Sequence, residues 1–76
     1  MKDLVEYITK SLVDNPESVH VNEIESSSAV ILELQVADSD MGRVIGKGGR
    51  VVNAIRTVVQ VAADKEGKRV TLEILD

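Results

Sequence analysis

A cluster of glycines in the middle of the chain constrains the fold more than any other feature of the sequence. Residues 44–50 read Val-Ile-Gly-Lys-Gly-Gly-Arg and hold three of the five glycines. Apolar residues at helical spacing lie on both sides of them, within residues 41–45 and 50–64. Because glycine is unfavourable inside a helix, this stretch predicts a tight turn between two helices.

Length and composition limit how such a turn can be supported. The chain has 76 residues with no phenylalanine, tryptophan or cysteine. A single domain over residues 1–76 must therefore have an aliphatic core, without disulfides or thiolate metal sites. Neither a signal-peptide pattern nor an apolar run of about 20 residues is present, so we expect a soluble, cytoplasmic protein.

The segment before the glycines predicts one helix and two strands. Residues 1–12 have the spacing of an amphipathic helix, which Asn15-Pro16 ends. Thr9 is expected to face away from the core of the protein, and Tyr7, the only aromatic residue, to pack at its rim. Residues 18–25 and 30–36 alternate as two strands of a hairpin, joined by the polar turn at residues 26–28.

The complete pattern predicts an α+β fold with the element order α-β-β-α-α-β. Residues 70–74 alternate as a third strand, and Asp38-Ser39-Asp40 can cap the first of the two central helices. We expect a two-layer fold in which a three-stranded mixed sheet has its helices packed on one face. The two central helices can form a right-handed crossover, so the third strand should run parallel to the second.

Charge is unevenly distributed along the chain. The formal net charge is −4, from nine basic and thirteen acidic residues. Between Met41 and Ala63 there is no acidic residue, while this segment holds Arg43, Lys47, Arg50 and Arg56. Such segregation concentrates positive potential on one surface. It favours restricted binding of single-stranded nucleic acid, most simply RNA, although residue types do not distinguish RNA from single-stranded DNA.

Other functions fit the residues less well. A P-loop needs four residues between its first glycine and Gly-Lys, but only three separate Gly42 from Gly46, and Gly48 replaces the required hydroxyl residue. The dinucleotide-binding pattern G-x-G-x-x-G is absent, and no nucleophile is paired with a base, so the sequence predicts no enzyme and no cofactor. His20, the only histidine, has no second ligand near it, which favours an exposed strand residue over a metal site. A purely structural glycine turn beside a solvated basic face is the remaining alternative.

The glycine stretch, the apolar helix after it and the element order together resemble a type II KH domain. Residues 40–46 and the chain length further resemble the small, stand-alone bacterial KH proteins of the KhpA (YlqC) family, over essentially the whole chain. The resemblance implies a non-catalytic protein that clamps about four nucleotides of single-stranded RNA with a GxxG loop. The RNA-binding residues it implies are Gly42, Arg43, Val44, Ile45, Gly46, Lys47, Gly48, Gly49, Arg50, Val52 and Asn53.

Each of these residue types has a physical reason to lie in such a site. Gly46 and Gly49 can adopt left-handed dihedral angles and bring backbone close to phosphates, with Lys47 and Arg50 as the charged contacts. Val44, Ile45 and Val52 are expected to form an apolar groove floor under the bases. Because the motif contains no aromatic side chain for base stacking, we expect modest affinity.

A second hypothesis concerns assembly. The apolar arc of the helix after Gly49 is wider than a core stripe requires, which often marks a partner site. We expect self-association, or pairing with another KH protein, through Ala54, Thr57, Val58 and Val61. The resemblance implies KhpB (Jag, EloR) as the larger partner, an RNA-chaperone or post-transcriptional regulatory role, and a link to cell elongation and envelope synthesis. The alternative function is a structural dimerisation adaptor with little RNA affinity of its own.

Overall fold

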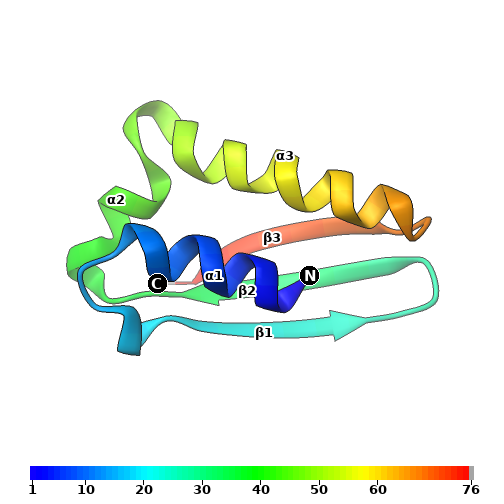
Figure 1. Cartoon of the computed structure of the whole chain (residues 1–76), viewed down its shortest axis with the longest axis horizontal. Coiled ribbons are helices and arrows are strands. Elements are labelled where there is room, and N and C mark those ends of the chain that lie inside the picture. Colours follow the sequence, from blue (N-terminus) through cyan, green and yellow to red (C-terminus); the bar gives the residue numbers. More distant parts are fainter. Residues whose placement is uncertain (76) are drawn as a thin grey trace.

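Three strands form one sheet in the computed structural model, which describes residues 1–75 (Figure 1). Short 3-10 turns lie at Pro16–Ser18, Asp38–Asp40 and Lys47–Gly49. The predicted order α-β-β-α-α-β is confirmed. The six main elements are α1 (Lys2–Leu12), β1 (His20–Glu25), β2 (Ala29–Gln35), α2 (Met41–Ile45), α3 (Arg50–Lys65) and β3 (Arg69–Leu75).

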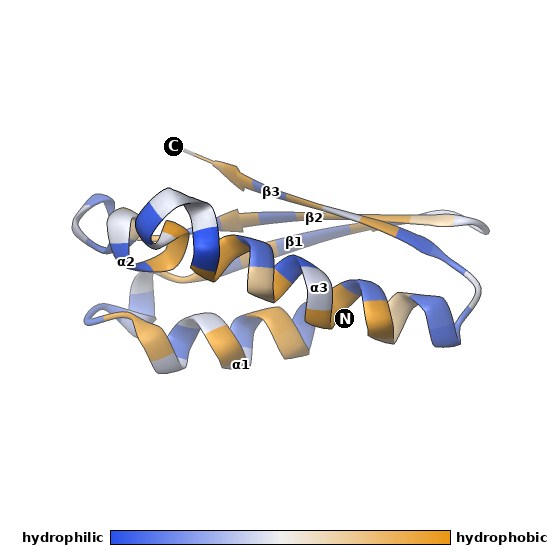
Figure 2. Cartoon of the chain, turned by 90° about the horizontal axis from the view of Figure 1, so that it is seen from above, coloured by the Kyte–Doolittle hydropathy of each residue, from blue (hydrophilic) through white to orange (hydrophobic). Residues whose placement is uncertain are grey.

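The sheet is mixed, with β2 in its centre. β1 pairs antiparallel with β2, so that Val21 lies opposite Leu34. β3 pairs parallel with β2, with Leu72 beside Leu32. The helices cover one face of the sheet (Figure 2). The predicted mixed sheet is confirmed, and β3 runs parallel to β2 after α2 and α3 as expected.

The core between these layers is aliphatic. Alternation along β2 turns Val30, Leu32 and Leu34 inward, and their exposed fractions are near zero. Buried residues of α3 belong to the same hydrophobic cluster as these strand residues. The same cluster contains Val5, Val19, Val21, Val36, Val44, Val52, Ile55, Val59 and Leu72. None of the helices described within residues 1–75 is long and apolar enough to span a membrane.

The orientation of α1 differs from the sequence prediction at two residues. Thr9 is 0% exposed, and Tyr7 is 73% exposed instead of packing at the rim of the core. The reason is that α1 contacts both β1 and α3, so its buried side includes Thr9, one turn after Val5. The Thr9 hydroxyl has no hydrogen-bond partner within the described residues.

Asp40 connects the start of α2 to the segment after α1. Its carboxylate accepts hydrogen bonds from the backbone N–H of Asp14 at 3.1 Å and of Asn15 at 3.0 Å, and from Asn15 Nδ2 at 3.0 Å. The N-capping role predicted for residues 38–40 is wrong, because α2 begins without a side-chain cap. The carboxylate is instead committed to N–H groups from a distant segment, which would otherwise be left without an acceptor.

These hydrogen bonds also affect the ionisation of Asp40. The backbone N–H of Asp14 contributes most to holding the pKa of Asp40 below its ordinary value. Burial acts in the opposite direction, and Asn15 and Arg43 add to the lowering. Asp40 is therefore charged at neutral pH although its side chain is buried.

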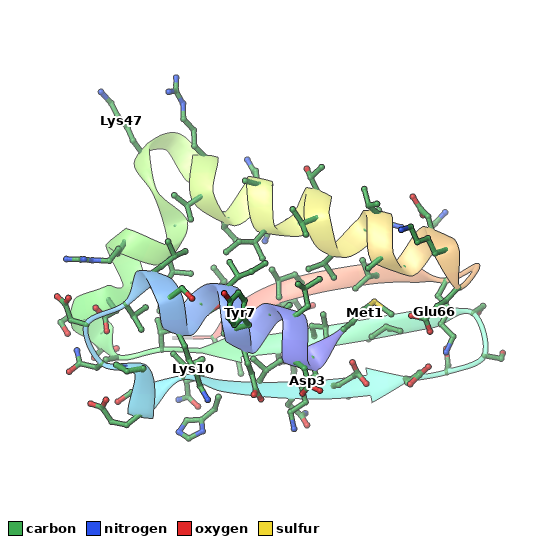
Figure 3. The ribbon with its side chains drawn as sticks, in the orientation of Figure 1. Met1, Asp3, Tyr7, Lys10, Lys47 and Glu66 are labelled. Carbon is green, nitrogen blue, oxygen red and sulfur yellow. The ribbon has the colours of Figure 1, made fainter. Side chains whose placement is uncertain are left out.

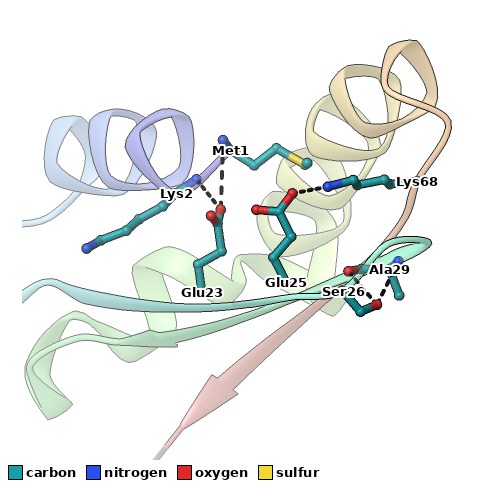
Figure 4. A network of polar contacts seen from close by, with 7 residues as sticks. All are labelled: Met1, Lys2, Glu23, Glu25, Ser26, Ala29 and Lys68. Atoms are coloured by element: carbon teal, nitrogen blue, oxygen red, sulfur yellow. Dashed lines mark hydrogen bonds and ion pairs between the residues drawn. The ribbon is translucent and has the colours of Figure 1, made fainter.

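Two acidic residues of β1 also make contacts beyond the sheet (Figure 4). Glu23 Oε1 accepts a hydrogen bond from the backbone N–H of Lys2 at 3.1 Å and lies 3.9 Å from the N-terminal ammonium. A carboxylate at this position interacts favourably with the positive end of the α1 dipole. Glu25 forms an ion pair with Lys68, which leads into β3.

Candidate nucleic-acid interface

The loop between α2 and α3 has a backbone that requires glycine. Gly46 has φ 76° and ψ 171°, a combination that residues with a Cβ atom avoid. A Cβ atom there would also lie 2.8 Å from the backbone N of Val51 and overlap the Val51 side chain. Gly48 and Gly49 follow with φ values of 64° and 81°. The glycines therefore let the chain reverse within four residues, directly against the first turn of α3.

Lys47 and Arg50 are the charged side chains at this loop. Both are exposed, and Lys47 extends away from the ribbon at the loop (Figure 3). Within residues 1–75 neither forms an ion pair or a side-chain hydrogen bond, whereas Arg43 on α2 lies 3.3 Å from Asp14. The positive charge of Lys47 and Arg50 is thus available to an anion, while that of Arg43 is partly compensated.

The other residues predicted for the loop site differ in their exposure. Val44 and Val52 are buried in the core, where they support the loop from below, and Ile45 is partly buried beside them. Gly42 is exposed on α2 with open space around its Cα. Asn53 is exposed on α3, where its Oδ1 accepts a hydrogen bond from Arg56. The surface beside the loop is therefore not formed by Val44 or Val52.

A hollow of about 700 Å³ lies between α3 and β3. The valines and leucine among its lining residues make it largely apolar, with Gln60 and Arg56 on the α3 side. Sequence reasoning missed this hollow, because it forms only where α3 lies beside the outer edge of β3. Its lining residues are Arg56, Thr57, Val59, Gln60, Val61, Val70, Thr71, Leu72 and Glu73.

Side chains of α3 hydrogen-bond the backbone of β3 at this hollow. Arg56 Nε and Nη2 donate to the backbone oxygen of Leu72 at 3.3 and 3.1 Å. Gln60 Oε1 accepts a hydrogen bond from the N–H of Val70 at 3.4 Å. β3 is an edge strand, so these groups lie on the side that no neighbouring strand covers.

The residues predicted for a partner interface form a stripe on α3. Val58 and Val61 are 47% and 54% exposed, and Ala54 and Thr57 are exposed beside them. Their spacing of three and four residues places them on one side of the helix. Thr57 and Val61 also line the hollow, so the stripe and the hollow adjoin.

The described residues contain no group of three or more His, Cys, Asp or Glu side chains that could hold a metal ion. His20 is exposed on β1. The chemistry of this surface is therefore that of cations, backbone groups and a largely apolar hollow.

A family model and several known proteins match this chain over nearly its whole length. A family model described as "KhpA/KhpB, KH domain" matches residues 2–74. A protein of Clostridium perfringens is 61% identical over 75 residues, which cover 99% of this chain and all of the relative. A relative from Caldanaerobacter subterraneus is 57% identical over the same shares, and one from Aquifex aeolicus is 49% identical over all of this chain and 96% of its own. Each of the three is named "RNA-binding protein KhpA".

Proposed function

Because the chain belongs to the KhpA/KhpB family of KH-domain proteins, we propose that it is a non-catalytic, single-stranded RNA-binding protein of the cytoplasm. About four nucleotides would lie along the loop at Gly46–Gly49, as in other KH domains. The names of the relatives from three organisms support RNA as the ligand.

The observation that carries the proposal is the pair of uncompensated cations at the glycine loop. Lys47 and Arg50 have no acidic partner within the described residues, although acidic residues outnumber basic ones in the chain. Phosphate oxygens would accept hydrogen bonds from these side chains and from backbone N–H groups in the first turn of α3. The absence of side chains at Gly46 and Gly49 lets the RNA backbone approach closely.

The bases would lie on the side of α3 that faces the hollow. Its aliphatic lining offers van der Waals contact, and the outer edge of β3 offers backbone hydrogen-bonding groups. Val44 and Val52 would act from below, by holding α2 and α3 in place, and the partly buried Ile45 would be the accessible part of the floor. Tyr7, the only aromatic residue, does not line the hollow, so each site should bind RNA weakly.

The test is binding of a short fluorescent single-stranded RNA to the wild type and to the double variant Lys47→Asp/Gly48→Asp. Gly48 has open space around its Cα and a positive φ, which aspartate adopts more readily than most residues although at some cost, so both carboxylates fit without contacting the core. We expect affinity to fall at least about tenfold through repulsion of phosphate, a change of roughly 1.4 kcal/mol or more. Circular dichroism would confirm that the variant is folded.

The chain offers a matched control at the turn between α3 and β3. Gly67 also has a positive φ, 69°, with open space around its Cα, and Lys65 beside it is exposed. Lys65→Asp/Gly67→Asp therefore makes the same charge change away from the loop. If RNA affinity fell equally in the two double variants, the effect would be one of net charge. If the loop variant bound RNA as tightly as the wild type, the GxxG mechanism would be excluded.

We further propose that the protein acts as a homodimer or with a larger KH protein such as KhpB. The exposed stripe of Ala54, Thr57, Val58 and Val61 supports this, because water-exposed valines on one side of a helix favour burial against a partner. Two linked weak sites bind an RNA far more tightly than one. In this proposal the protein is an RNA chaperone or post-transcriptional regulator, with the link to cell elongation and envelope homeostasis that the family resemblance implies.

The stripe also favours a second candidate function, that of a dimerisation adaptor with little RNA affinity. Analytical ultracentrifugation of the wild type and of Val61→Lys tests the assembly. We expect the wild type to dimerise and the variant, with a charge at the C-terminal end of the stripe, to be monomeric. A wild type that stays monomeric at high micromolar concentration would exclude the homodimer. Dimerisation without measurable RNA binding would favour the adaptor.

A further inference from the structure

We propose that Arg56 determines which base enters the hollow between α3 and β3. Its guanidinium group would bind a base that presents two neighbouring hydrogen-bond acceptors, which means guanine or cytosine. This inference rests on the proposed RNA-binding function, and it assigns a sequence preference to the same surface.

The guanidinium group of Arg56 is held in place by two different elements. Nε and Nη2 donate to the backbone oxygen of Leu72 on β3, at 3.3 and 3.1 Å. Nη1 donates to Asn53 Oδ1, one turn earlier on α3, at 3.2 Å. Partners on two elements fix the plane of the guanidinium group before any ligand arrives, which lowers the entropy that binding costs.

The hydrogen bonds leave two donors for a ligand. A guanidinium group has five N–H donors, and three of them are used within residues 1–75. One N–H therefore remains on each terminal nitrogen, Nη1 and Nη2. Two donors in one plane match two adjacent acceptors on a planar partner.

This match distinguishes the four bases. Guanine presents O6 and N7 side by side, and cytosine presents O2 and N3. Adenine places an amino donor next to its N1 and N7 acceptors, and uracil places an N–H between its two carbonyl groups. A fixed arginine fork therefore favours guanine and cytosine over adenine and uracil.

The surroundings of Arg56 favour a contact with a base over a contact with a phosphate. Arg56 lies six residues after Arg50, which is about 9 Å along the helix axis from the glycine loop. It is the only basic residue among those that line the hollow, next to Val59, Val61, Val70 and Leu72. Glu73 also lines the hollow, but it forms no ion pair with Arg56. Arg56 is exposed as a residue, but its hydrogen bonds to Leu72 are partly buried. A base that covered this side of the guanidinium group would exclude water from it, which strengthens a matched hydrogen bond and raises the cost of an unmatched one.

The experiment compares four fluorescent RNAs of about eight nucleotides, roughly twice the length that a KH domain holds. The first RNA contains only adenine and the second only uracil. The third is an adenine RNA with central cytosines, and the fourth is an adenine RNA with two separated central guanines. We expect the wild type to bind the cytosine or the guanine RNA roughly tenfold more tightly than the adenine RNA. Arg56→Lys keeps the charge but loses the fork, so the ratio of affinities between the preferred RNA and the adenine RNA should fall from roughly tenfold to less than about twofold.

The matched control is Arg69→Lys, the same change at an exposed arginine that does not line this hollow. It should keep the wild-type preference. Thermal melting checks that both variants are folded. In parallel, the NMR chemical shift of the Arg56 Nε–H group in the wild type should change when the preferred RNA is added and not when the adenine RNA is added. This measurement needs no variant.

Four outcomes would overturn the inference. An equal loss of affinity for all four RNAs in Arg56→Lys would make Arg56 a phosphate contact. A wild type that binds all four RNAs equally, or a variant that keeps the preference, would leave Arg56 with a structural role only, that of connecting α3 to β3 through its hydrogen bonds. A wild type that binds none of them would remove the proposed function as well, so the two failures are distinguishable.

Discussion

The two glycine- or serine-rich turns of this small domain are built in opposite ways. The hairpin turn from Ser26 to Ala29 is closed by its own groups. The Ser26 N–H donates to the Ala29 oxygen at 2.8 Å, and the Ala29 N–H donates to Ser26 Oγ at 3.2 Å. The adjacent Glu25 is paired with Lys68 (Figure 4). The Gly46–Gly49 loop instead has three positive φ values and two cations without partners among the described residues.

This difference shows where the protein can bind a ligand. The hairpin turn satisfies its polar groups locally and offers little to an anion. The glycine loop also has local backbone hydrogen bonds, from Gly46 N–H to the Gly42 oxygen at 2.9 Å and from Gly49 N–H to the Gly46 oxygen at 3.2 Å, but it leaves its charge free. The first turn of α3 packs directly against it. Glycine adopts these dihedral angles without strain, whereas a residue with a Cβ atom at Gly46 would be strained. The comparison can be tested by replacing Gly46, the carboxylate of Asp40 and the charge of Lys47 in turn.

Gly46→Ala should have the largest effect. The variant needs a dihedral combination that costs about 1–3 kcal/mol, and its Cβ atom would overlap Val51. We expect the free energy of unfolding to fall by at least that amount, and RNA affinity to fall at least about tenfold as the loop rearranges. Urea denaturation and fluorescence anisotropy would measure the two quantities.

The control for this prediction is Gly42→Ala in α2. Gly42 has open space around its Cα, and alanine is about 1 kcal/mol more favourable than glycine inside a helix. The control should be as stable as the wild type or more stable. If both variants behaved alike, the backbone of the glycine loop would not be the constrained one.

The sequence predicted most of this fold because its patterns are local. Periods of two and 3.6 residues located all six main elements, and the parallel third strand followed from the long connection before it. What the sequence could not give depends on contacts between distant segments. Thr9 is buried because α1 meets β1 and α3 at once, and the α3 pattern alone does not reveal the edge of β3 beside Arg56.

In the candidate site, too, some features could be predicted from residue type and others depend on packing between segments. The glycines and the charges of Lys47 and Arg50 could be read from the sequence, because residue type decides both. Val44 and Val52 have the same residue type as surface valines such as Val58, and only the packing shows that they are buried. Asp40 looked like a capping residue, because aspartate before a helix usually is one. Its true partners lie 25 and 26 residues earlier in the chain.

Asp40→Asn tests the hydrogen bonds that connect the start of α2 to the segment after α1. We expect it to lower the free energy of unfolding, by less than Gly46→Ala does. The amide keeps one acceptor oxygen but turns a donor toward the N–H groups of Asp14 and Asn15. The variant should be less stable than the wild type at neutral pH. Asp38→Asn, an exposed neighbour without a side-chain hydrogen bond among the described residues, should leave stability unchanged.

The pH dependence of this difference has a definite sign. The pKa of Asp40 is lowered in the folded protein, so its ionised form stabilises the fold above the ordinary aspartate pKa of about 3.9. That stabilisation is lost as the pH falls from this value through the folded-state pKa. Urea midpoints of wild type and Asp40→Asn should therefore differ at pH 7 and converge in acid. A constant difference from neutral to acidic pH would contradict an ionised clamp.

Lys47→Gln removes the unpaired charge of the glycine loop, and Lys68→Gln removes the paired charge beside the hairpin turn. Of the predicted changes, we expect Lys47→Gln to have the smallest effect. If two to four phosphates are contacted, log affinity should fall against log salt with a slope of about −1.4 to −2.8. Lys47→Gln should reduce the magnitude of this slope by about 0.7, because one phosphate contact is lost. Lys68→Gln removes the same charge, but Lys68 is already paired with Glu25, so the slope should remain nearly that of the wild type. Equal slopes in the two variants would mean that the RNA responds to total charge and not to the loop. A wild type whose affinity does not depend on salt would indicate that the protein is an adaptor.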